Sequence, residues 1–143
     1  MPARSVGAEV GSDRDALLDL TVAYCWALDS RSFDELDDVF LPDATADLGR
    51  RLVGRPAIKE LIRTALVPLD VSQHTVSTHQ FGVDGDRATG RCYLHAQHVR
   101  AGEQYIVAGR YEDRYVRTAD GWRIEHRTLT VMWTSGNPDV LRT

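Results

Sequence analysis

The hydrophobic pattern of this chain changes its period near Asp70, and this change constrains the fold. Before Asp70, apolar residues recur at helical spacing, and after it they alternate as they do in strands. Three helices are expected, from a capping box at residues 12–15 to Leu28, from Ser32 to Phe40, and from Pro56 to the residue before Pro68. Short strands are expected over residues 44–48 and within 49–54, and long strands over residues 73–83, 88–100, 104–117 and 122–134.

Helices followed by a strand meander are typical of an α+β domain, with three N-terminal helices packed on one face of a curved antiparallel sheet. The last strand changes phase, because Trp122 and Ile124 alternate on one face while Leu129 and Trp133 alternate on the other. Either a bulge shifts the register there, or both faces of the sheet are buried, which would require a partner subunit.

The length of 143 residues suits one domain, expected over residues 12–135 between a flexible N-terminus (1–11) and a C-terminal tail (136–143). No apolar run approaches the roughly 20 residues of a membrane span, and no secretion signal is apparent. The net charge of −4 disfavours nucleic acid as a partner. Cys25 and Cys92 are far apart and predict reduced, buried thiols. We therefore expect a cytoplasmic protein with no membrane or nucleic-acid partner.

An acidic residue at the end of the first helix is the first candidate for chemistry. Asp29 lies at the end of an otherwise apolar stripe, where a carboxylate is costly unless it has a partner. His74, at the start of the first long strand, is the candidate partner. A carboxylate bonded to one ring nitrogen would leave the other free to act as a base. The alternatives are a solvated helix-end aspartate and an ordinary strand-end histidine.

Two further residues have both a catalytic and a structural interpretation. Tyr24 could donate a hydrogen bond to a substrate oxygen, or it could be an ordinary core aromatic residue. Arg127 alternates with apolar residues on the last strand, so it should be paired or face a cavity. It could stabilise an anion, or it could lie at an exposed sheet edge or in an interface ion pair.

Four of the five histidines, His74, His79, His95 and His98, lie close together in the sequence and suggest a metal site. On regular strands, however, His95 and His98 would face opposite ways, and so would His74 and His79. No metal-ligand spacing, glycine-rich phosphate loop or nucleophile elbow is present, so we expect neither a metal nor a cofactor.

A set of short motifs resembles the SnoaL-like branch of the nuclear transport factor 2 (NTF2)-like superfamily over residues 12–135. The motifs are Tyr24-x4-Asp29, Phe40-Leu-Pro-Asp-Ala44, Gly54-Arg-Pro-Ala-Ile58, Gln73-His74-x-Val-Ser77, Asp84-Gly-Asp-Arg-Ala88, Gly109-Arg-Tyr-x-Asp113 and Gly121-Trp-Arg-Ile124. The resemblance implies a cone-shaped α+β barrel around an apolar pocket, usually in a trimer and alternatively in a dimer.

The resemblance also implies site residues. Dehydratase and dehydrochlorinase members carry an Asp–His dyad, which falls on Asp29 and His74. The bile-acid dehydratase adds a tyrosine and an arginine, whose nearest matches are Tyr24 and Arg127. The candidates for substrate contact are Tyr93, Tyr105, Tyr111 and Trp133.

These implications together predict a cofactor-independent lyase of the dehydratase type, or an isomerase or cyclase. The expected substrate is small and hydrophobic, polyketide-like or steroid-like, and Asp–His acid/base catalysis would transform it. The alternative is a module of the same fold that binds a ligand, or assembles with a partner, without catalysis. A structural subunit beside a ring-hydroxylating oxygenase is a third hypothesis, from fold analogy alone.

Overall fold

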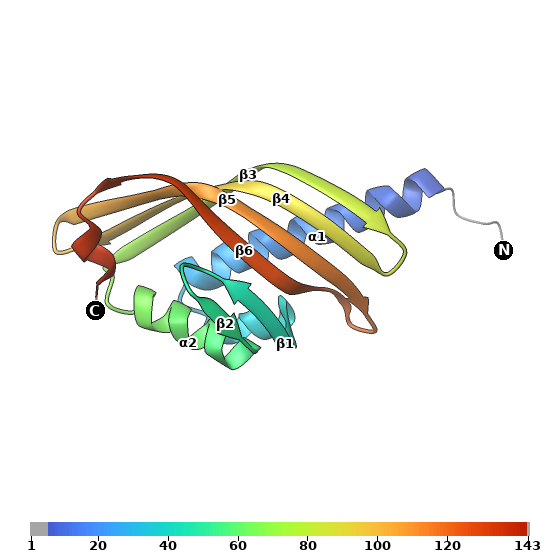
Figure 1. Ribbon diagram of the computed structural model, residues 1–143, viewed down its shortest axis with the longest axis horizontal. Coiled ribbons are helices and arrows are strands. Elements are labelled where there is room, and N and C mark those ends of the chain that lie inside the picture. Colours follow the sequence, from blue (N-terminus) through green and yellow to red (C-terminus); the bar gives the residue numbers. More distant parts are fainter. Residues whose placement is uncertain (1–5, 143) are drawn as a thin grey trace.

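The computed structural model describes residues 6–142, and it describes residues 6–11 by their backbone alone. Figure 1 shows the long helix α1 and the shorter helix α2, both from the N-terminal half, against a sheet built mostly from the C-terminal half. The helical elements are α1 (Val6–Asp29), the 3₁₀-helix η1 (Phe33–Asp38), α2 (Arg55–Leu66) and the 3₁₀-helix η2 (Pro138–Leu141). The strands are β1 (Phe40–Asp47), β2 (Arg51–Val53), β3 (Val71–Asp84), β4 (Arg87–Arg100), β5 (Glu103–Thr118) and β6 (Gly121–Gly136).

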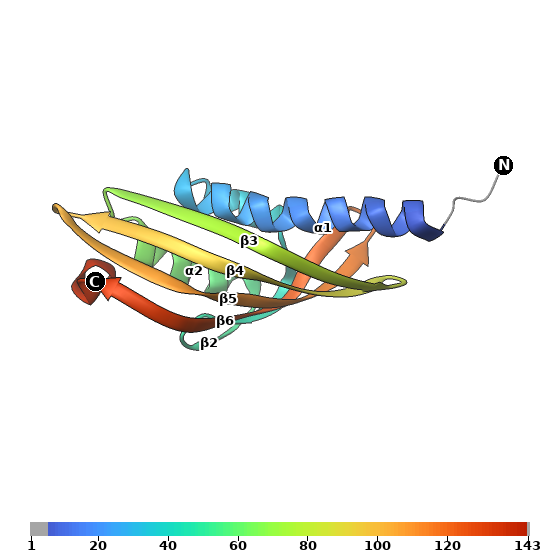
Figure 2. The ribbon, with the colours of Figure 1, turned by 90° about the horizontal axis from the view of Figure 1, so that it is seen from above.

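The six strands form one sheet in the order β2-β1-β6-β5-β4-β3. Strands β3 to β6 form an antiparallel meander, and β1 joins it by parallel pairing with β6. Figure 2 shows the curvature of the sheet, with α1 running along β3 on one side. The expected α+β architecture of three helices on a curved sheet is confirmed, with the second helix in the 3₁₀ form. The sheet is not wholly antiparallel as expected, because β1 pairs with β6 in parallel.

Helix α1 packs its apolar stripe on the sheet, as the periodicity predicts. Leu17, Leu20, Tyr24 and Leu28 are buried in the core, whereas Trp26 on the outer face is 68% exposed. Burial of this stripe is what stabilises the helix in place, since each fully buried Leu contributes roughly 1.5–3 kcal/mol.

The start of α1 differs from the prediction. The helix begins at Val6 and continues through residues 12–15, so these residues do not form the expected cap. Asp13 instead pairs with Arg117 and accepts a hydrogen bond from the Trp122 indole, which ties α1 to the hairpin between β5 and β6. Residues 1–5 of the expected flexible segment lie outside the described part of the chain.

Bulges in β3 and β6 decide which side chains face the helices. In β3 the register with β4 shifts between Ser77 and Gln80, and Thr78 adopts a φ of 59°. This bulge turns His79 to the same face as His74, so the prediction that they oppose each other is wrong. In β6 a shift beside Glu125 accounts for the phase change between Ile124 and Leu129, as the bulge alternative predicted. A second shift beside Met132 turns Trp133 to the outer face, so the expectation that it shares a face with Leu129 is wrong.

The C-terminal tail returns to the body of the protein. Helix η2 buries Val140, and the Arg100 guanidinium donates a hydrogen bond to the carbonyl of Arg142. Sequence analysis treated this segment only as a polar tail, because four residues are too few to show a periodic pattern.

Helices long and apolar enough for a membrane span do not occur among residues 6–142. The structure contains one chain, so the expected trimer or dimer stays a prediction. Both cysteines are buried and free of disulfide bonds, as predicted.

Candidate active site

Asp29 and His74 meet where the end of α1 crosses the start of β3. Oδ1 of Asp29 lies 2.7 Å from Nδ1 of His74, and Oδ2 accepts the His74 backbone N–H at 2.7 Å. Ser72 donates its hydroxyl to Oδ1 at 2.9 Å. Burial alone would raise the pKa of Asp29, but the hydrogen bonds from His74 and Ser72 outweigh it and hold the pKa below its ordinary value.

The protonation of the His74 ring follows from its partner. An ionised carboxylate only accepts hydrogen bonds, so Nδ1 of His74 carries a proton. In the neutral ring, Nε2 then keeps its lone pair and can accept a proton from another molecule. The His74 side chain is only 6% exposed, which shields this nitrogen from bulk solvent.

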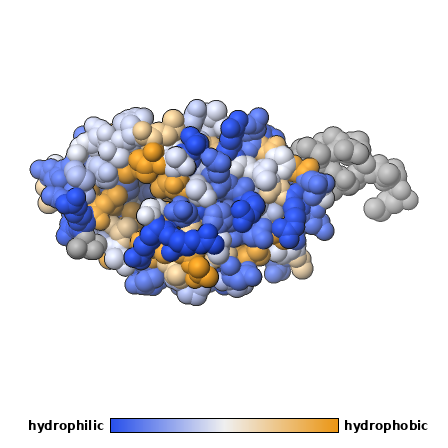
Figure 3. All heavy atoms as spheres, viewed as in Figure 1, coloured by the Kyte–Doolittle hydropathy of each residue, from blue (hydrophilic) through white to orange (hydrophobic). Residues whose placement is uncertain are grey.

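His74 forms part of the wall of an apolar cavity of about 140 Å³. The cavity lies between the sheet, α2 and the C-terminal turn, and its apolar lining includes Leu28, Leu61, Ile62, Leu94, Leu129 and Leu141. In Figure 3, apolar surface gathers around a hollow in this region, between α2 and the C-terminal part of β6. The polar groups in the wall come from Tyr24, His74, His98 and Tyr111.

His98 is a second imidazole in the same wall. Its ring contacts the His74 ring edge to face, with centroids 5.6 Å apart. Nδ1 lies 3.0 Å from the Tyr105 carbonyl, which only accepts, so Nδ1 carries the proton and Nε2 is an acceptor. Burial lowers the pKa of His98 more than this hydrogen bond raises it, so the ring is neutral near pH 7. The sequence pattern indicated His98 only as a potential metal ligand and gave no sign of this position in the cavity wall.

Behind Tyr24 and Tyr111 lies a buried ion pair. Arg127 is fully buried and donates two hydrogen bonds to Asp113, at 2.8 and 2.9 Å. Its guanidinium lies over the faces of both Tyr24 and Tyr111, 4.4 and 3.9 Å from their ring centroids. The Tyr115 hydroxyl donates to the same carboxylate at 2.9 Å. This cluster supports the pocket wall from behind.

A family model described as a SnoaL-like domain matches residues 9–128. The chain belongs to the SnoaL-like domain family. The resemblance inferred from the motifs is thereby confirmed.

Relatives of this SnoaL-like domain are similar over most of their length. Protein Rv2910c of Mycobacterium tuberculosis is 40% identical over 126 residues, which cover 83% of this chain and 85% of that protein. A structure from Novosphingobium aromaticivorans, assigned as an aromatic ring hydroxylase, is 30% identical with a TM-score of 0.84, covering 92% of this chain and 97% of the other.

Two further structures share the fold at lower identity. One, from Novosphingobium aromaticivorans and assigned as a scytalone dehydratase, has a TM-score of 0.81 at 22% identity over 88% of each chain. The other, a hexachlorocyclohexane dehydrochlorinase, LinA type 2, has a TM-score of 0.82 at 18% identity, covering 92% of this chain and 93% of that one. These two likenesses show that the SnoaL-like domain shares its fold with both structures.

The structure separates the residues that sequence analysis grouped into one site. Tyr24 and Tyr111 line the cavity of the SnoaL-like domain together with His74. Arg127 does not line it, because pairing of β5 with β6 places Asp113 opposite Arg127 and buries both. The expectation that Arg127 meets substrate is therefore replaced by the paired alternative.

The other three candidates for substrate contact do not line this cavity. Tyr93 and Trp133 are half exposed on the outer face of the sheet, where the Trp133 ring contacts His95. Tyr93 alternates with buried Cys92, so the strand pleat turns its side chain outward. Tyr105 contributes its backbone carbonyl and its ring to the orientation of His98.

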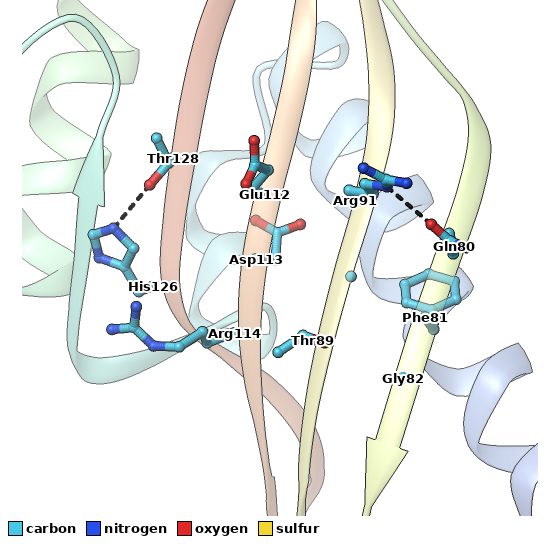
Figure 4. A pocket seen from close by; sticks show the side chains of 11 residues that line it. Gln80, Phe81, Gly82, Thr89, Arg91, Glu112, Asp113, Arg114, His126 and Thr128 are labelled. Atoms are coloured by element: carbon cyan, nitrogen blue, oxygen red, sulfur yellow. Dashed lines mark hydrogen bonds between the residues drawn. The ribbon is translucent and has the colours of Figure 1, made fainter.

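A larger hollow of about 550 Å³ lies on the outer face of the sheet. Figure 4 shows its side chains, with Arg91, Glu112 and Arg114 of mixed charge across two strands and His126 bonded to Thr128. The His126 imidazole is hydrogen-bonded through one ring nitrogen to the Thr45 hydroxyl at 2.6 Å, and through the other to the Thr128 hydroxyl at 3.0 Å. This hollow therefore offers no acid–base pair comparable to the dyad. Among residues 6–142, no cluster of three potential metal ligands is found.

The histidines of the SnoaL-like domain predict acid sensitivity of the fold. Burial is the main cause that lowers the pKa of His79, His98 and His126 below the ordinary value of about 6.5. The unfolded chain therefore binds more protons, so stability is complete above about pH 6.5 and falls as the pH drops below it. Urea unfolding at pH 7.0 and 5.5 should show this loss.

The matched variants are His98→Gln, which should reduce the difference between the two pH values, and His95→Gln on the exposed outer face, which should not. Equal unfolding free energies at pH 7.0 and 5.5 for the parent protein would contradict the prediction.

Proposed function

We propose that this protein is a cofactor-independent lyase that eliminates water, or a similar small leaving group, from a neutral cyclic substrate. The observation that carries the proposal is the 2.7 Å contact between Asp29 and His74 in the wall of an apolar cavity. Structural neighbours assigned as a scytalone dehydratase and named as a dehydrochlorinase support it, since both names denote eliminations.

The proposed step begins at Nε2 of His74, which removes a proton from a carbon beside an activating group of the substrate. Asp29 stabilises the imidazolium that forms and keeps the ring in one orientation. The electron pair of the C–H bond forms the new double bond as the C–O bond breaks. The departing hydroxide takes the proton from His74, so water leaves and the base returns to its neutral state.

The other polar groups of the wall would orient the substrate. In its neutral form His98 presents Nε2 as an acceptor and suits a substrate hydroxyl group. Tyr24 and Tyr111 are neutral, because burial raises the pKa of each phenol, and the Tyr24 hydroxyl group can donate to a carbonyl oxygen. No Lys or Arg lines this cavity within the described residues, which favours an uncharged substrate.

The volume of the cavity favours a small substrate. A cavity of about 140 Å³ is close to the roughly 150 Å³ apolar cavity known to hold benzene. It therefore favours a substrate with one ring, or a compact pair of rings, over a steroid skeleton. Within the expected class of small hydrophobic substrates, this supports the smaller polyketide-like compounds.

The test is turnover of a panel of neutral one-ring and two-ring β-hydroxy ketones. Elimination creates a conjugated double bond, so absorbance follows the reaction directly. The parent protein and His95→Gln, a histidine variant on the outer face, should convert the same compounds, whereas His74→Gln should not. If His74→Gln converts every compound as fast as the parent, the proposed mechanism is wrong.

A second candidate function is a module that binds the same class of ligand without transforming it. The position of Arg127 favours this alternative, because its ion pair with Asp113 leaves the cavity without the cation expected to stabilise a developing anion. In that case a bound panel compound would be recovered unchanged, and His74→Gln would alter affinity alone.

A further inference from the structure

We propose that Arg31 and Ser72 form a positioning relay that holds the Asp29 carboxylate against His74. The inference deepens the proposed function and rests on it for its importance, although the relay itself is measurable without substrate. Arg31 follows the end of α1, and Ser72 precedes His74 by two residues on β3, so the relay joins the same two elements as the dyad.

The hydrogen bonds of the relay run in one direction. The Arg31 guanidinium donates from Nη1 to Oγ of Ser72 at 2.8 Å, and Ser72 lies 2.9 Å from Oδ1 of Asp29. A guanidinium only donates, so the single hydroxyl proton of Ser72 is directed at the carboxylate. Because Ser72 is only 4% exposed, water does not easily replace either partner.

The conformation of Arg31 indicates that its side chain has a specific task. Its backbone has a φ of 60°, a left-handed conformation that is unfavourable for a residue with a side chain. Glycine is the usual residue at such a helix end. Here the backbone brings Nη1 to 2.8 Å from the Leu28 carbonyl, at the negative end of the α1 dipole, and at the same time to Ser72.

As a result, both carboxylate oxygens of Asp29 accept hydrogen bonds from the protein. Oδ2 is held by the His74 amide, and Oδ1 receives both the His74 ring and the Ser72 hydroxyl. Without Ser72, the carboxylate could rotate about its last bond and lose its alignment with Nδ1. The charges and titratable groups facing His74 are Asp29 from α1, His98 from β4, and Arg31 beside Asp29.

The test uses nitrogen-15-labelled histidine and nuclear magnetic resonance near pH 7, without substrate. In the parent, the Nδ1 proton of His74 should give a downfield signal, and the nitrogen shifts should report an Nδ1-protonated ring. Ser72→Ala and Arg31→Gly should each weaken or abolish that signal and mix the two tautomers. Ser72→Thr, which keeps the hydroxyl group, should restore it.

Arg31→Gly separates positioning from folding, because glycine accepts the left-handed backbone and should leave the melting temperature unchanged or higher. If the downfield signal and tautomer persist in both Ser72→Ala and Arg31→Gly, the relay is refuted while the proposed function stands. If the parent itself lacks the Nδ1 proton, the dyad and the proposed function fail. Once a substrate is found, Ser72→Ala should lower kcat about tenfold with little change in KM.

Discussion

Replacement of Asp29 by Asn is expected to lower turnover about 10³–10⁴-fold while leaving the fold intact, by analogy with the corresponding change in a serine-protease triad. Asn keeps the size of the side chain but loses the charge that stabilises the imidazolium. Its amide can also donate a hydrogen bond to Nδ1 of His74, which would move the ring proton to Nε2 and remove the base. The loss should appear mainly in kcat, because Asp29 lies behind His74 and does not line the cavity.

The matched control is Asp70→Asn. Asp70 also accepts a backbone N–H, from Ala101 at 2.8 Å, but it lies at an exposed turn away from the cavity. This variant should turn over substrate at the parent rate. Turnover by Asp29→Asn within a few-fold of the parent would contradict general base catalysis by the dyad and favour the binding alternative.

The second large effect concerns the buried pair of Arg127 and Asp113. Arg127→Met is expected to destabilise the protein by about 3–5 kcal/mol, because it leaves the Asp113 carboxylate buried without its charged partner. It also removes the cation that lies over the rings of Tyr24 and Tyr111. For a domain of this size the melting temperature should fall by about 10–20 °C, as calorimetry would measure.

Two controls isolate the burial of this pair. Arg110→Met breaks an exposed pair with Glu112 of similar length, 2.8 Å, and should cost less than about 1 kcal/mol. The double variant Arg127→Met with Asp113→Leu should be more stable than Arg127→Met alone, because it removes the orphaned charge. A loss below 1 kcal/mol in Arg127→Met would show that the ion pair does not stabilise the pocket wall.

The contact between Asp29 and His74 could be predicted from sequence because both signals were local. A carboxylate on an apolar helical stripe requires a partner, and a histidine at the start of a strand is a suitable one. The same local argument placed Tyr24 on the core face of α1, where the structure has it. The order of helices and strands followed from the change of period after Asp70.

The predictions failed where the position of a side chain depends on how strands pair with one another. A bulge at Thr78 in β3 reversed the facing of His79, and strand pairing brought Asp113 opposite Arg127. Outward turns of Tyr93 and Trp133 likewise depend on strand register, and a shift of one residue moves a side chain to the other face. The place of His98 in the cavity wall was not predicted, because its orientation depends on a hydrogen bond to the Tyr105 carbonyl, and no side-chain pattern reveals a backbone partner.

The helices, the strands and the pairing of Asp29 with His74 follow from local sequence patterns, because helical and strand periodicity and the cost of burying a charge act over short distances. Which polar groups share the cavity depends instead on how distant parts of the chain pack together. Register, bulges and the returning C-terminal turn bring His98, Tyr111 and Leu141 to His74, and they remove Arg127 from the cavity wall. Those placements depend on contacts between residues far apart in the chain, and single-sequence periodicity does not encode such contacts directly.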